Sequence, residues 1–511
     1  MTTVAELLQF CPSAPLNEAW ATIQPNHLVL DSRAVQPGDV FVALKGSQRD
    51  GREFIDSAIA NGASLVFAES DSIQGSPIKD ALIKGDLIKE EWRGDVAVLF
   101  LPHLTQKLSH MAAQFYGCPA NSLHGFAVTG TNGKTTCSHL YANLRQRLGD
   151  RVGVVGTLGY GVYGEPLNET GYTTPDAIYL QKILSELNDH SVDFLSVEAS
   201  SHSLDQGRLN AVPISSALYT NLSRDHLDYH GDMESYAQSK WQLFDRGELK
   251  IAVINWDDDY GRQWLSRLSS QVSTYSYSIE NAQADVFASE IRYHDQGVNA
   301  RLTTPWGNTE IQSPLMGAFN LSNLLGVLTV LLAEGVALEK LAPELAAIKP
   351  IAGRMQSLPK KAGQPHVVID FAHTPDGLQH ALTALRQHCQ GQLWCIFGCG
   401  GDRDTGKRPQ MAAVSESIAD SIVVTNDNPR SEQPEDIAEQ IMQGFKKPEN
   451  VKVLLDRGQA IEWAINQAGE NDCLLVAGKG HESYQLIGNQ RLDHCDYQIC
   501  SKVLAQRGQT L

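Results

Sequence analysis

Short apolar runs alternate with stretches of helical periodicity along most of the chain. In the first hundred residues, the apolar runs 40–44, 65–68 and 96–101 have the length of buried strands, whereas 55–61 and 104–116 are compatible with helices. Alternation of strands with helices predicts parallel sheets that are covered by helices on both faces. We therefore expect an α/β fold.

Two interruptions divide this alternation into three predicted domains. A strand that enters a glycine-rich loop begins near Leu123, and Pro350 and Gly353 mark a second break. A chain of 511 residues is also too long for one typical core. We predict a small N-terminal α/β domain (1–103), a central domain with a P-loop ATPase-like parallel sheet (104–350) and a C-terminal Rossmann-like α/β domain (351–511).

Polar clusters directly follow six of the apolar runs. These runs are 192–197, 217–220, 367–369, 393–397, 422–424 and 474–477. In open parallel sheets, ligands bind beyond the carboxyl ends of the strands. Six polar strand ends in two domains therefore predict sites that face a shared cleft.

The stretch VTGTNGKTT at 128–136 lies between an apolar run and a helix-compatible run, which is the layout of a phosphate-binding loop. Glycines let backbone N–H groups turn toward an anion, and a helix N-terminus adds partial positive charge. Lys134 can reach the β- and γ-phosphates of ATP, and the Thr135 hydroxyl can bind Mg²⁺. The general pattern has glycine in place of Val128, so an ordinary glycine turn with a surface lysine remains an alternative. The predicted ATP-binding residues here are Gly130, Thr131, Asn132, Gly133, Lys134, Thr135 and Thr136.

Composition excludes several classes of function. The net charge of −18 argues against a nucleic-acid-binding groove. The nine cysteines include no C-x-x-C pair, which gives no support for a zinc ribbon or redox motif, and their low density suits a reducing cytosol. No signal peptide is evident, and the apolar run 324–333 is too short to span a bilayer. We expect a cytoplasmic protein without membrane insertion, and we predict a buried helix at 324–333.

Glu198 directly follows a run that should be buried. A buried carboxylate is costly unless it is paired or metal-bound, and in a P-loop domain its natural partner is Mg²⁺ on the ATP phosphates. The alternative is an acid at a helix N-terminus. His226, in the polar segment 221–231, is a candidate second metal ligand or phosphate contact, although the segment can also be a solvated loop. His202 can equally be structural, and Lys240 has the spacing of an ordinary helix lysine.

Arg403 and Arg430 each lie in a turn after a strand of the third domain. Arginine binds carboxylates through two parallel hydrogen bonds, so two such residues suggest an acidic or amino-acid substrate. Asp427 and Glu482 could hold an ammonium group. An internal network of ion pairs is the alternative.

Taken together, the segments resemble the ATP-dependent Mur ligases of bacterial cell-wall synthesis. The motifs run in order along essentially the whole chain: TGTNGKTT, EASSH, TNLSRDHLDYH, MGAFN, GRM, DFAHTP and DNPR. Val128 is normal for this family. The DNPR form resembles the branch that adds meso-2,6-diaminopimelate to UDP-N-acetylmuramoyl-L-alanyl-D-glutamate, and the lysine-adding branch typically differs at this arginine.

The resemblance implies amide-bond formation through an acyl phosphate in peptidoglycan biosynthesis, with ATP as co-substrate and Mg²⁺ as cofactor. The partners that we expect are small-molecule substrates only, and we expect a monomer. The alternatives are the L-lysine-adding ligase, a ligase like folylpolyglutamate synthase, and a nucleotide-binding regulatory module without ligase activity.

The resemblance also implies the roles of individual residues in catalysis and ATP binding. The implied catalytic residues are Lys134, Glu198, His226 and Lys240. The implied magnesium ligands are Thr135, Glu198, His226 and Lys240, the last as a carbamylated lysine (N6-carboxylysine). Further nucleotide contacts are implied at Asn320, Asn323, Arg354 and Asp370.

Substrate contacts are implied in all three domains. The implied uridine-diphosphate contacts are Leu30, Ser32, Ser47, Gln48 and Arg49, and the N-terminal domain is expected to bind the UDP-sugar. The implied contacts to the muramoyl dipeptide are Thr173, Thr174, Ser200, Gln206 and Arg208. The implied diaminopimelate contacts are Arg403, Asp427, Asn428, Pro429, Arg430, Gly478 and Glu482. Tyr172 stands where related enzymes often have asparagine, which leaves the fine contacts to the sugar nucleotide open.

Overall fold

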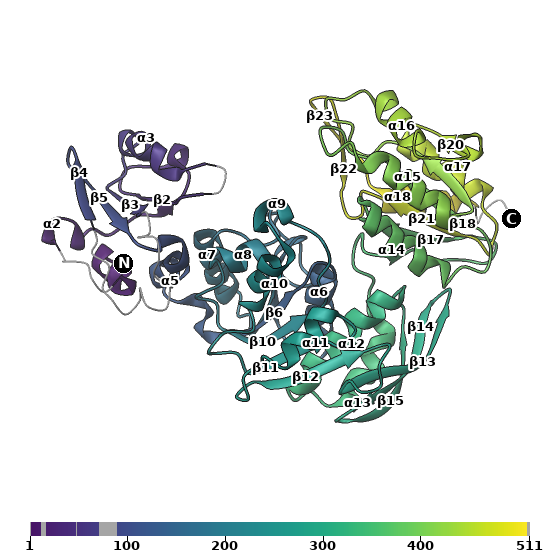
Figure 1. The fold of residues 1–511 in the computed structure, drawn as a ribbon, viewed down its shortest axis with the longest axis horizontal. Helices are drawn as coiled ribbons and strands as arrows, with labels where there is room; N and C mark the ends of the chain where they lie inside the picture. The colour runs from purple at the N-terminus through teal and green to yellow at the C-terminus, as the bar shows by residue number, and fades with distance from the viewer. Residues whose placement is uncertain (1, 12–16, 47–48, 71–88, 508–511) are drawn as a thin grey trace. The chain divides into compact units, whose positions relative to one another are not determined.

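Strands and helices alternate along the chain in the computed structural model, as Figure 1 shows. The structure describes residues 2–11, 17–46, 49–70 and 89–507. It divides into two compact units, Met1–Tyr275 and Ser276–Leu511. The described residues form three mixed sheets and one two-stranded hairpin, so the predicted α/β class is confirmed. The predicted domain boundaries at 103/104 and 350/351 stay predictions.

The N-terminal sheet has the strand order β1-β2-β3-β5-β4, and its strands are parallel except for the pair β4–β5. The strands are β1 (Leu28–Val29), β2 (Val40–Ala43), β3 (Leu65–Glu69), β4 (Lys89–Arg93) and β5 (Val96–Leu101). Val40 and Val42 pack in one core, and Phe41 and Ala43 pack in another. Both faces of β2 are therefore buried, which explains why its sequence is a continuous apolar run.

Short helices accompany this sheet. They are α1 (Val4–Leu7), α2 (Glu18–Ala21) and α3 (Ile55–Ala60), with the 3-10 turns η1 (Leu8–Phe10), η2 (Ser32–Ala34) and η3 (Gly51–Phe54). The longer helix α5 (Leu104–Phe115) and the 3-10 turn η4 (Pro119–Ser122) follow. The predicted helices at 55–61 and 104–116 are confirmed as α3 and α5.

The second sheet of the first unit contains the order β11-β10-β6-β9-β7-β8. Its strands are β6 (His124–Thr129), β7 (Val152–Gly156), β8 (Gly159–Val162), β9 (Phe194–Glu198), β10 (Ile214–Tyr219) and β11 (Ile251–Asn255). Only β8 among these runs antiparallel to its neighbour. The carboxyl ends of β6, β7, β9 and β10 therefore lie at one edge of the sheet.

The helices of this part of the chain connect its parallel strands. They are α6 (Lys134–Arg147), α7 (Ala177–Asp189), α8 (Ser201–Asp205), α9 (Leu227–His230), α10 (Met233–Trp241) and α11 (Asp259–Leu265). Strand β12 (Ser273–Ser278) contains the division between the two units.

The second unit begins with an antiparallel meander that the sequence analysis did not anticipate. Its strands are β13 (Val286–His294), β14 (Gly297–Thr304) and β15 (Gly307–Ser313). In β14, buried Val298, Ala300 and Leu302 alternate with exposed Asn299 and Arg301. This alternation with a period of two was the signal that could have predicted the strand.

A long buried helix follows the meander. It is α12 (Ala318–Ala333), which contains the helix predicted at 324–333, and α13 (Leu338–Leu341) and the 3-10 turn η5 (Ala342–Ala347) come next. No helix in the described part of the chain is long and apolar enough to cross a membrane.

The C-terminal sheet has the order β16-β17-β21-β18-β19-β20, and only β16 is antiparallel to its neighbour. The strands are β16 (Gln356–Ser357), β17 (His366–Asp370), β18 (Leu393–Phe397), β19 (Ser421–Val424), β20 (Val451–Val453) and β21 (Cys473–Ala477). Four of the polar clusters predicted from the sequence therefore lie at the carboxyl edge of one sheet.

Helices cover both faces of the C-terminal sheet (Figure 1). One core contains residues of α14 (Pro375–Arg386), α15 (Lys407–Ile418) and α16 (Pro434–Met442). The core on the other face contains residues of α17 (Arg457–Gln467) and α18 (Asp496–Arg507). The 3-10 turn η6 (Pro448–Asn450) and a hairpin of β22 (Tyr484–Ile487) and β23 (Gln490–Asp493) complete this part of the chain.

Candidate active site

The predicted phosphate loop connects β6 to α6. Gly130 has φ 153° and Gly133 has φ 89°, and a Cβ atom on Gly130 would lie 1.9 Å from the Thr220 hydroxyl. Glycine is therefore required for the loop to pass this close to β10. No side chain caps α6, so its N-terminus can face an anion as in other phosphate-binding loops. Thr135 and Thr136 lie buried in the first turn of the helix.

The residues that follow β10 hold the loop in place. The Thr131 amide donates to the Asn221 carbonyl at 2.8 Å, and the Asn132 amide donates to Asn221 Oδ1 at 3.0 Å. The Thr220 hydroxyl donates to the Asn132 carbonyl at 2.6 Å. The start of the polar segment 221–231 is therefore a support of the loop.

Lys134 and Lys240 meet at the beginning of the loop. Lys134 Nζ donates to the Gly130 and Thr131 carbonyls, and Lys240 Nζ donates to the same Gly130 carbonyl, each at 2.8 Å. Lys240 is only 1% exposed and its ammonium lies over the Tyr236 ring. Burial, with repulsion from Lys134, lowers the pKa of Lys240 well below its usual value. The structure thus places Lys240 in the site, which its helical spacing did not indicate.

Glu198 ends β9 and is fully buried. Its Oε2 atom accepts hydrogen bonds from the Thr135 hydroxyl at 2.9 Å and the Thr157 hydroxyl at 3.1 Å, and its Oε1 atom accepts from the Thr157 amide at 2.8 Å. A Cβ atom on Gly156 would lie 2.2 Å from Glu198 Oε1, so the close approach of β7 requires glycine. The two predicted magnesium ligands Thr135 and Glu198 are therefore in direct contact.

His226 lies close to the lysines. Its backbone has φ 53°, its side chain is about half exposed, and Asp225 Oδ2 lies 3.5 Å from its Nε2. Burial lowers the pKa of His226; the charge of Asp225 acts against this, and the charges of Lys134 and Lys240 act with it. A neutral imidazole is the form that binds a metal. In the part of the chain that the structure describes, no three His, Cys, Asp or Glu side chains form a preassembled metal site.

Four of the five residues predicted to contact the dipeptide lie together. The Thr174 hydroxyl lies 2.7 Å from the Glu198 carbonyl and 3.3 Å from the Ser200 hydroxyl. Arg208 donates to the Thr174 carbonyl at 2.7 Å and to Gln206 Oε1 at 2.7 and 3.1 Å.

The fifth residue, Thr173, extends this group toward β7. Its hydroxyl lies 3.2 Å from the Thr157 hydroxyl, which donates to Glu198. Tyr172 beside it is 66% exposed.

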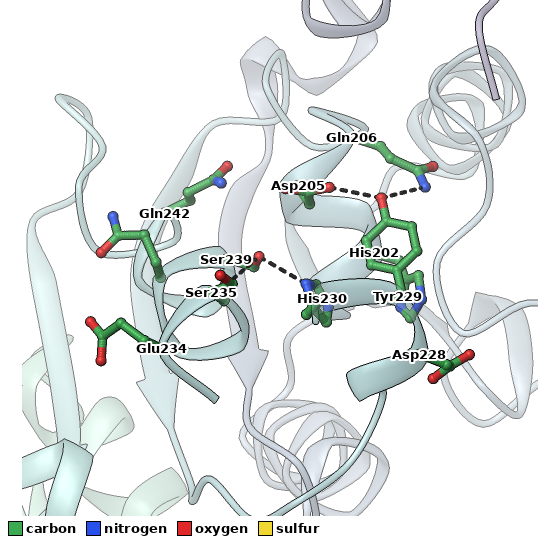
Figure 2. Close-up of a pocket in the computed structure, with 11 residues that line it drawn as sticks. His202, Asp205, Gln206, Asp228, Tyr229, His230, Glu234, Ser235, Ser239 and Gln242 are labelled. Carbon is green, nitrogen blue, oxygen red and sulfur yellow. Dashed lines mark hydrogen bonds between the residues drawn. The ribbon is translucent and has the colours of Figure 1, made fainter. Parts of the chain in front are cut away.

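A pocket of about 920 Å³ lies beside this cluster and is formed by α8, α9 and α10 (Figure 2). Gln206 lines it and donates to the Tyr229 hydroxyl at 3.1 Å, which in turn donates to Asp205 at 2.7 Å. His202 also lines it, and its ring centroid lies 4.9 Å from that of His226 and 5.4 Å from that of His230. His202 therefore belongs to the wall of the site.

The predicted uridine-diphosphate contacts lie near β1 and β2. Leu30 is partly buried against the N-terminal core, Ser32 is buried at the start of η2, and Arg49 is exposed. Ser47 and Gln48 lie outside the described residues.

The predicted nucleotide contacts of the second unit form two groups. Asn320 and Asn323 are buried in α12, where Asn320 donates to the Met316 carbonyl at 2.9 Å. Arg354 lies over the Phe371 ring, 4.9 Å from its centroid. Asp370 accepts hydrogen bonds from the Met355 and Ala372 amides at 2.7 and 2.8 Å, and burial raises its pKa.

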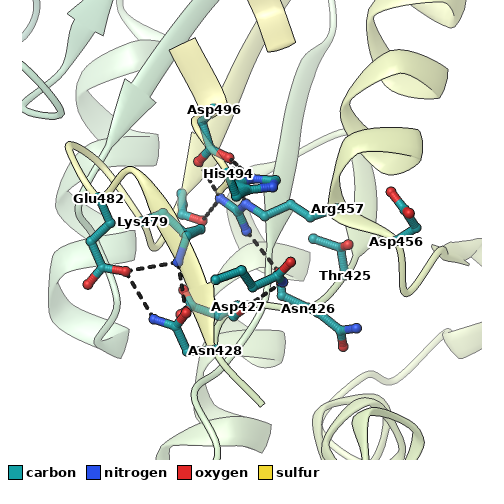
Figure 3. A network of polar contacts seen from close by, with 12 residues as sticks. Thr425, Asn426, Asp427, Asn428, Asp456, Arg457, Lys479, Glu482, His494 and Asp496 are labelled. Carbon is teal, nitrogen blue, oxygen red and sulfur yellow. Dashed lines mark hydrogen bonds and ion pairs between the residues drawn. The ribbon is translucent and has the colours of Figure 1, made fainter. Parts of the chain in front are cut away.

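The predicted diaminopimelate contacts follow β18, β19 and β21 at the carboxyl edge of the C-terminal sheet. Figure 3 shows three of them, Asp427, Asn428 and Glu482. Asn428 Nδ2 donates to Glu482 Oε2 at 3.0 Å, and a Cβ atom on Gly478 would lie 2.6 Å from Asp427 Oδ2. Asp427, Asn428 and Pro429 are buried, whereas Glu482 is partly exposed.

The two predicted arginines lie on neighbouring turns. Arg430 has φ 52° and donates to the Gly401 carbonyl at 2.7 Å. Arg403 is exposed on the turn that follows β18. The turn 398–404 and the segment 427–430 therefore contact each other, although the two segments are distant in sequence.

Two groups in this region were missed by the sequence analysis. Lys479 is fully buried and donates to Asn428 Oδ1 at 3.0 Å and to Glu482 Oε2 at 2.8 Å. Arg457 and Asp496 form a fully buried ion pair, and Arg457 also donates to the Asn426 and Ala477 carbonyls at the ends of β19 and β21. Burial alone would raise the pKa of Asp496, but the Arg457 charge and hydrogen bonds hold it below its usual range. The periodicity of the sequence does not predict ion pairs between residues that are distant in the chain.

Three family models match consecutive parts of the chain. They are the Mur ligase family, catalytic domain (residues 26–116), the Mur ligase middle domain (128–331) and the Mur ligase, glutamate ligase domain (353–480). A curated Haemophilus influenzae protein, named UDP-N-acetylmuramoyl-L-alanyl-D-glutamate–2,6-diaminopimelate ligase, is 45% identical over 480 residues, which cover 93% of this chain and 96% of that protein. The chain belongs to the Mur ligase family. The resemblance stated from the sequence motifs is therefore confirmed.

Solved structures agree with this membership. A structure titled UDP-N-acetylmuramoyl-L-alanyl-D-glutamate–2,6-diaminopimelate ligase is 34% identical, has a TM-score of 0.72, and covers 99% of this chain and 100% of its own. A Mycobacterium tuberculosis folylpolyglutamate synthase complexed with ADP is 20% identical, has a TM-score of 0.59, and covers 72% of this chain and 91% of its own. The latter shows a shared fold only. The expected class, an ATP-dependent ligase of the Mur family, is confirmed.

Proposed function

We propose that this ligase joins meso-2,6-diaminopimelate to the D-glutamate of UDP-N-acetylmuramoyl-L-alanyl-D-glutamate in peptidoglycan synthesis. The observation that supports it most is the cluster of Asn428, Arg430 and Glu482 at the carboxyl edge of the C-terminal sheet. A relative that is 45% identical over 93% of the chain bears the name of this activity.

ATP would bind at the phosphate loop. The α6 N-terminus would face the phosphates, and Lys134 would exchange its bonds to the loop carbonyls for the β- and γ-phosphate oxygens. Asn320, Asn323, Arg354 and Asp370 would contact the rest of the nucleotide.

The contact between Thr135 and Glu198 fits a magnesium site, because a hydroxyl and a buried carboxylate are oxygen ligands that Mg²⁺ prefers. Bound Mg²⁺ would offset negative charge on the transferring phosphoryl group. Glu198 and His226 would bind magnesium, and Lys240, after carbamylation, would bind the second ion. The low pKa of Lys240 favours the neutral amine, which is the form that reacts with carbon dioxide.

The acceptor is the γ-carboxylate of the D-glutamate. An amine does not displace oxygen from a carboxylate directly, because oxide is a very poor leaving group, whereas phosphate is a good one. Transfer of the γ-phosphoryl group produces an acyl phosphate, the incoming amine attacks its carbonyl carbon, and phosphate leaves. Arg208 and Lys134 would offset the repulsion between the two anions, and Thr173, Thr174, Ser200 and Gln206 would orient the dipeptide.

The amine would be presented from the C-terminal sheet. Diaminopimelate has a distal carboxylate and a distal ammonium, which suit Arg403 and Arg430 on one side and Glu482 on the other. L-Lysine lacks that carboxylate and would leave the guanidinium groups without their anion. A site built for polar partners discriminates strongly against analogues that lack them.

The three predicted domains would divide these tasks. Residues 1–103 would bind the UDP-sugar through Leu30, Ser32 and the segment 47–49, residues 104–350 would bind ATP, and residues 351–511 would bind the amino acid. We also propose that the enzyme is a monomer and that it is located in the cytoplasm.

The deciding experiment measures phosphate release from MgATP and UDP-N-acetylmuramoyl-L-alanyl-D-glutamate while only the amino acid is varied. We expect release with meso-diaminopimelate and little with L-lysine. Release with L-lysine alone would keep the ligase reaction and reject the amino-acid assignment. No release with either would reject the proposed reaction.

A further inference from the structure

Lys479 is a buried cation beside the amino-acid pocket, and no step of the proposed reaction uses it. It follows β21, and its side chain is fully buried. Its ammonium lies 2.8 Å from Glu482 Oε2, 3.0 Å from Asn428 Oδ1 and 5.6 Å from the centroid of the Tyr484 ring (Figure 3). Burying an ammonium is costly, so its retention at this place calls for a role.

Lys479 determines how Asn428 and Glu482 face the pocket. Asn428 Oδ1 accepts from Lys479 and from the Leu486 amide at 2.9 Å, which leaves Nδ2 to donate to Glu482 Oε2. Because Oε2 receives both Lys479 and Asn428, the carboxylate is held in one rotation. Asn428 and Glu482 are both predicted substrate contacts. Lys479 therefore acts on the substrate indirectly, through these two side chains.

The ends of β19 and β21 are also connected by a second buried cation, Arg457. Arg457 links the carbonyls of Asn426 and Ala477, which follow β19 and end β21, and Asp496 balances its charge inside the protein. Lys479 is paired instead with Glu482, whose side chain is 21% exposed. The charge of Lys479 therefore acts on a carboxylate of the pocket and not on a group in the protein core.

Lys479 reduces the attraction that the carboxylates of Glu482 and Asp427 would exert on a lone distal ammonium. Lys479 neutralises Glu482, and Arg403 and Arg430 lie on the adjoining turns. The distal end of diaminopimelate carries one carboxylate and one ammonium, whereas the distal end of L-lysine carries an ammonium alone. The ammonium of bound L-lysine and the ammonium of Lys479 would repel each other strongly, because like charges interact strongly in a site of low polarity.

We propose that Lys479 is a specificity-determining residue, which orients Asn428 and Glu482 and disfavours amino acids whose distal end is a lone ammonium. This inference rests on the proposed function. A purely structural lysine would affect both amino acids equally, whereas a specificity determinant changes their ratio.

The test compares four variants with the unmodified enzyme. Lys479→Met removes the charge and the donors, Lys479→Gln removes the charge and keeps a donor, Lys479→Arg keeps the charge, and Lys446→Met repeats the first substitution at an exposed lysine. For each, kcat/KM is measured with meso-diaminopimelate and with L-lysine, together with KM for ATP and the melting temperature.

We expect Lys479→Met and Lys479→Gln to lower the preference for diaminopimelate over L-lysine by about tenfold or more, with KM for ATP within about twofold. Lys479→Arg and Lys446→Met should keep the preference. If Lys479→Met does not fold, Lys479→Gln decides. An unchanged preference in a folded, uncharged variant, or an equal loss in Lys479→Arg, would overturn the inference. Failure of the unmodified enzyme with both amino acids would instead reject the proposed function.

Discussion

The ammonium groups of Lys134 and Lys240 both donate to the carbonyl oxygen of Gly130, each at 2.8 Å. Two like charges at one acceptor repel each other, and burial disfavours the charged form of Lys240 further. The loop that we propose to bind the nucleotide therefore also lowers the pKa of the lysine beside it. The shared Gly130 carbonyl places Lys240 in the site, although its spacing in the sequence is that of an ordinary helix lysine.

We expect Lys240→Ala to lose activity by about 10²-fold or more, because it would remove a metal ligand and a charge from the loop. If the carbamate on Lys240 supplies a carboxylate in the unmodified enzyme, added short carboxylic acids should replace it in the variant and restore part of the activity. Phosphate release with and without added acid measures both effects. Lys182→Ala, at an exposed position of α7, is the control. Full activity of Lys240→Ala would contradict the assignment.

Glu198→Gln should raise the Mg²⁺ concentration that is required and lower kcat by about 10²-fold. Glutamine has the shape of glutamate and can still accept from Thr135, but it lacks the charge that holds the ion. Magnesium titrations of phosphate release measure the effect, and Glu169→Gln, at an exposed loop position, is the control. If both variants respond to Mg²⁺ like the unmodified enzyme, Glu198 is not a magnesium ligand.

Arg430→Ala should raise KM for meso-diaminopimelate by about 30-fold or more and leave KM for ATP nearly unchanged, because a carboxylate would lose its charged partner. Steady-state kinetics with each substrate varied in turn make the comparison. Arg386→Ala, which removes a pairing with Asp420 at the other edge of the same sheet, is the control. Equal changes for both substrates would reject a role of Arg430 in the amino-acid pocket.

Stability should fall at acidic pH through His366, which is buried against Ser357. Burial, with repulsion from Lys360, lowers the pKa of His366 to about 4, whereas an unfolded histidine has a pKa of about 6.5. Between these values the unfolded chain binds the extra proton, so stability present above pH 6.5 is lost as the pH falls toward 4. The loss from this residue is up to about 3 kcal/mol.

Melting temperatures of the unmodified protein and of His366→Gln between pH 4 and pH 7 test this expectation. The variant should show a shallower decline, since glutamine cannot take up the proton. Parallel curves for the two proteins would mean that other groups cause the acid sensitivity.

Local patterns were sufficient for a number of the strands and helices, although not for most of them. The apolar runs became β2, β3 and β5, and the glycine-rich loop lies between a strand and α6. These features depend on periodicity and on the special conformations of glycine, which neighbours in sequence determine. The antiparallel strands β13–β15 were missed because the meander also requires pairing between strands, although the alternation in β14 was visible.

Sequence alone determined the α/β class, the phosphate loop with Lys134 and Thr135, and a set of polar strand ends that includes Glu198 and Asn428. Each of these features depends on a few consecutive residues. Only the tertiary structure decided that Lys240 shares a carbonyl with Lys134, that Thr135 contacts Glu198, and that Lys479 joins Asn428 to Glu482. Those contacts join residues from different elements, and their electrostatic consequences depend on burial that no short stretch of sequence specifies.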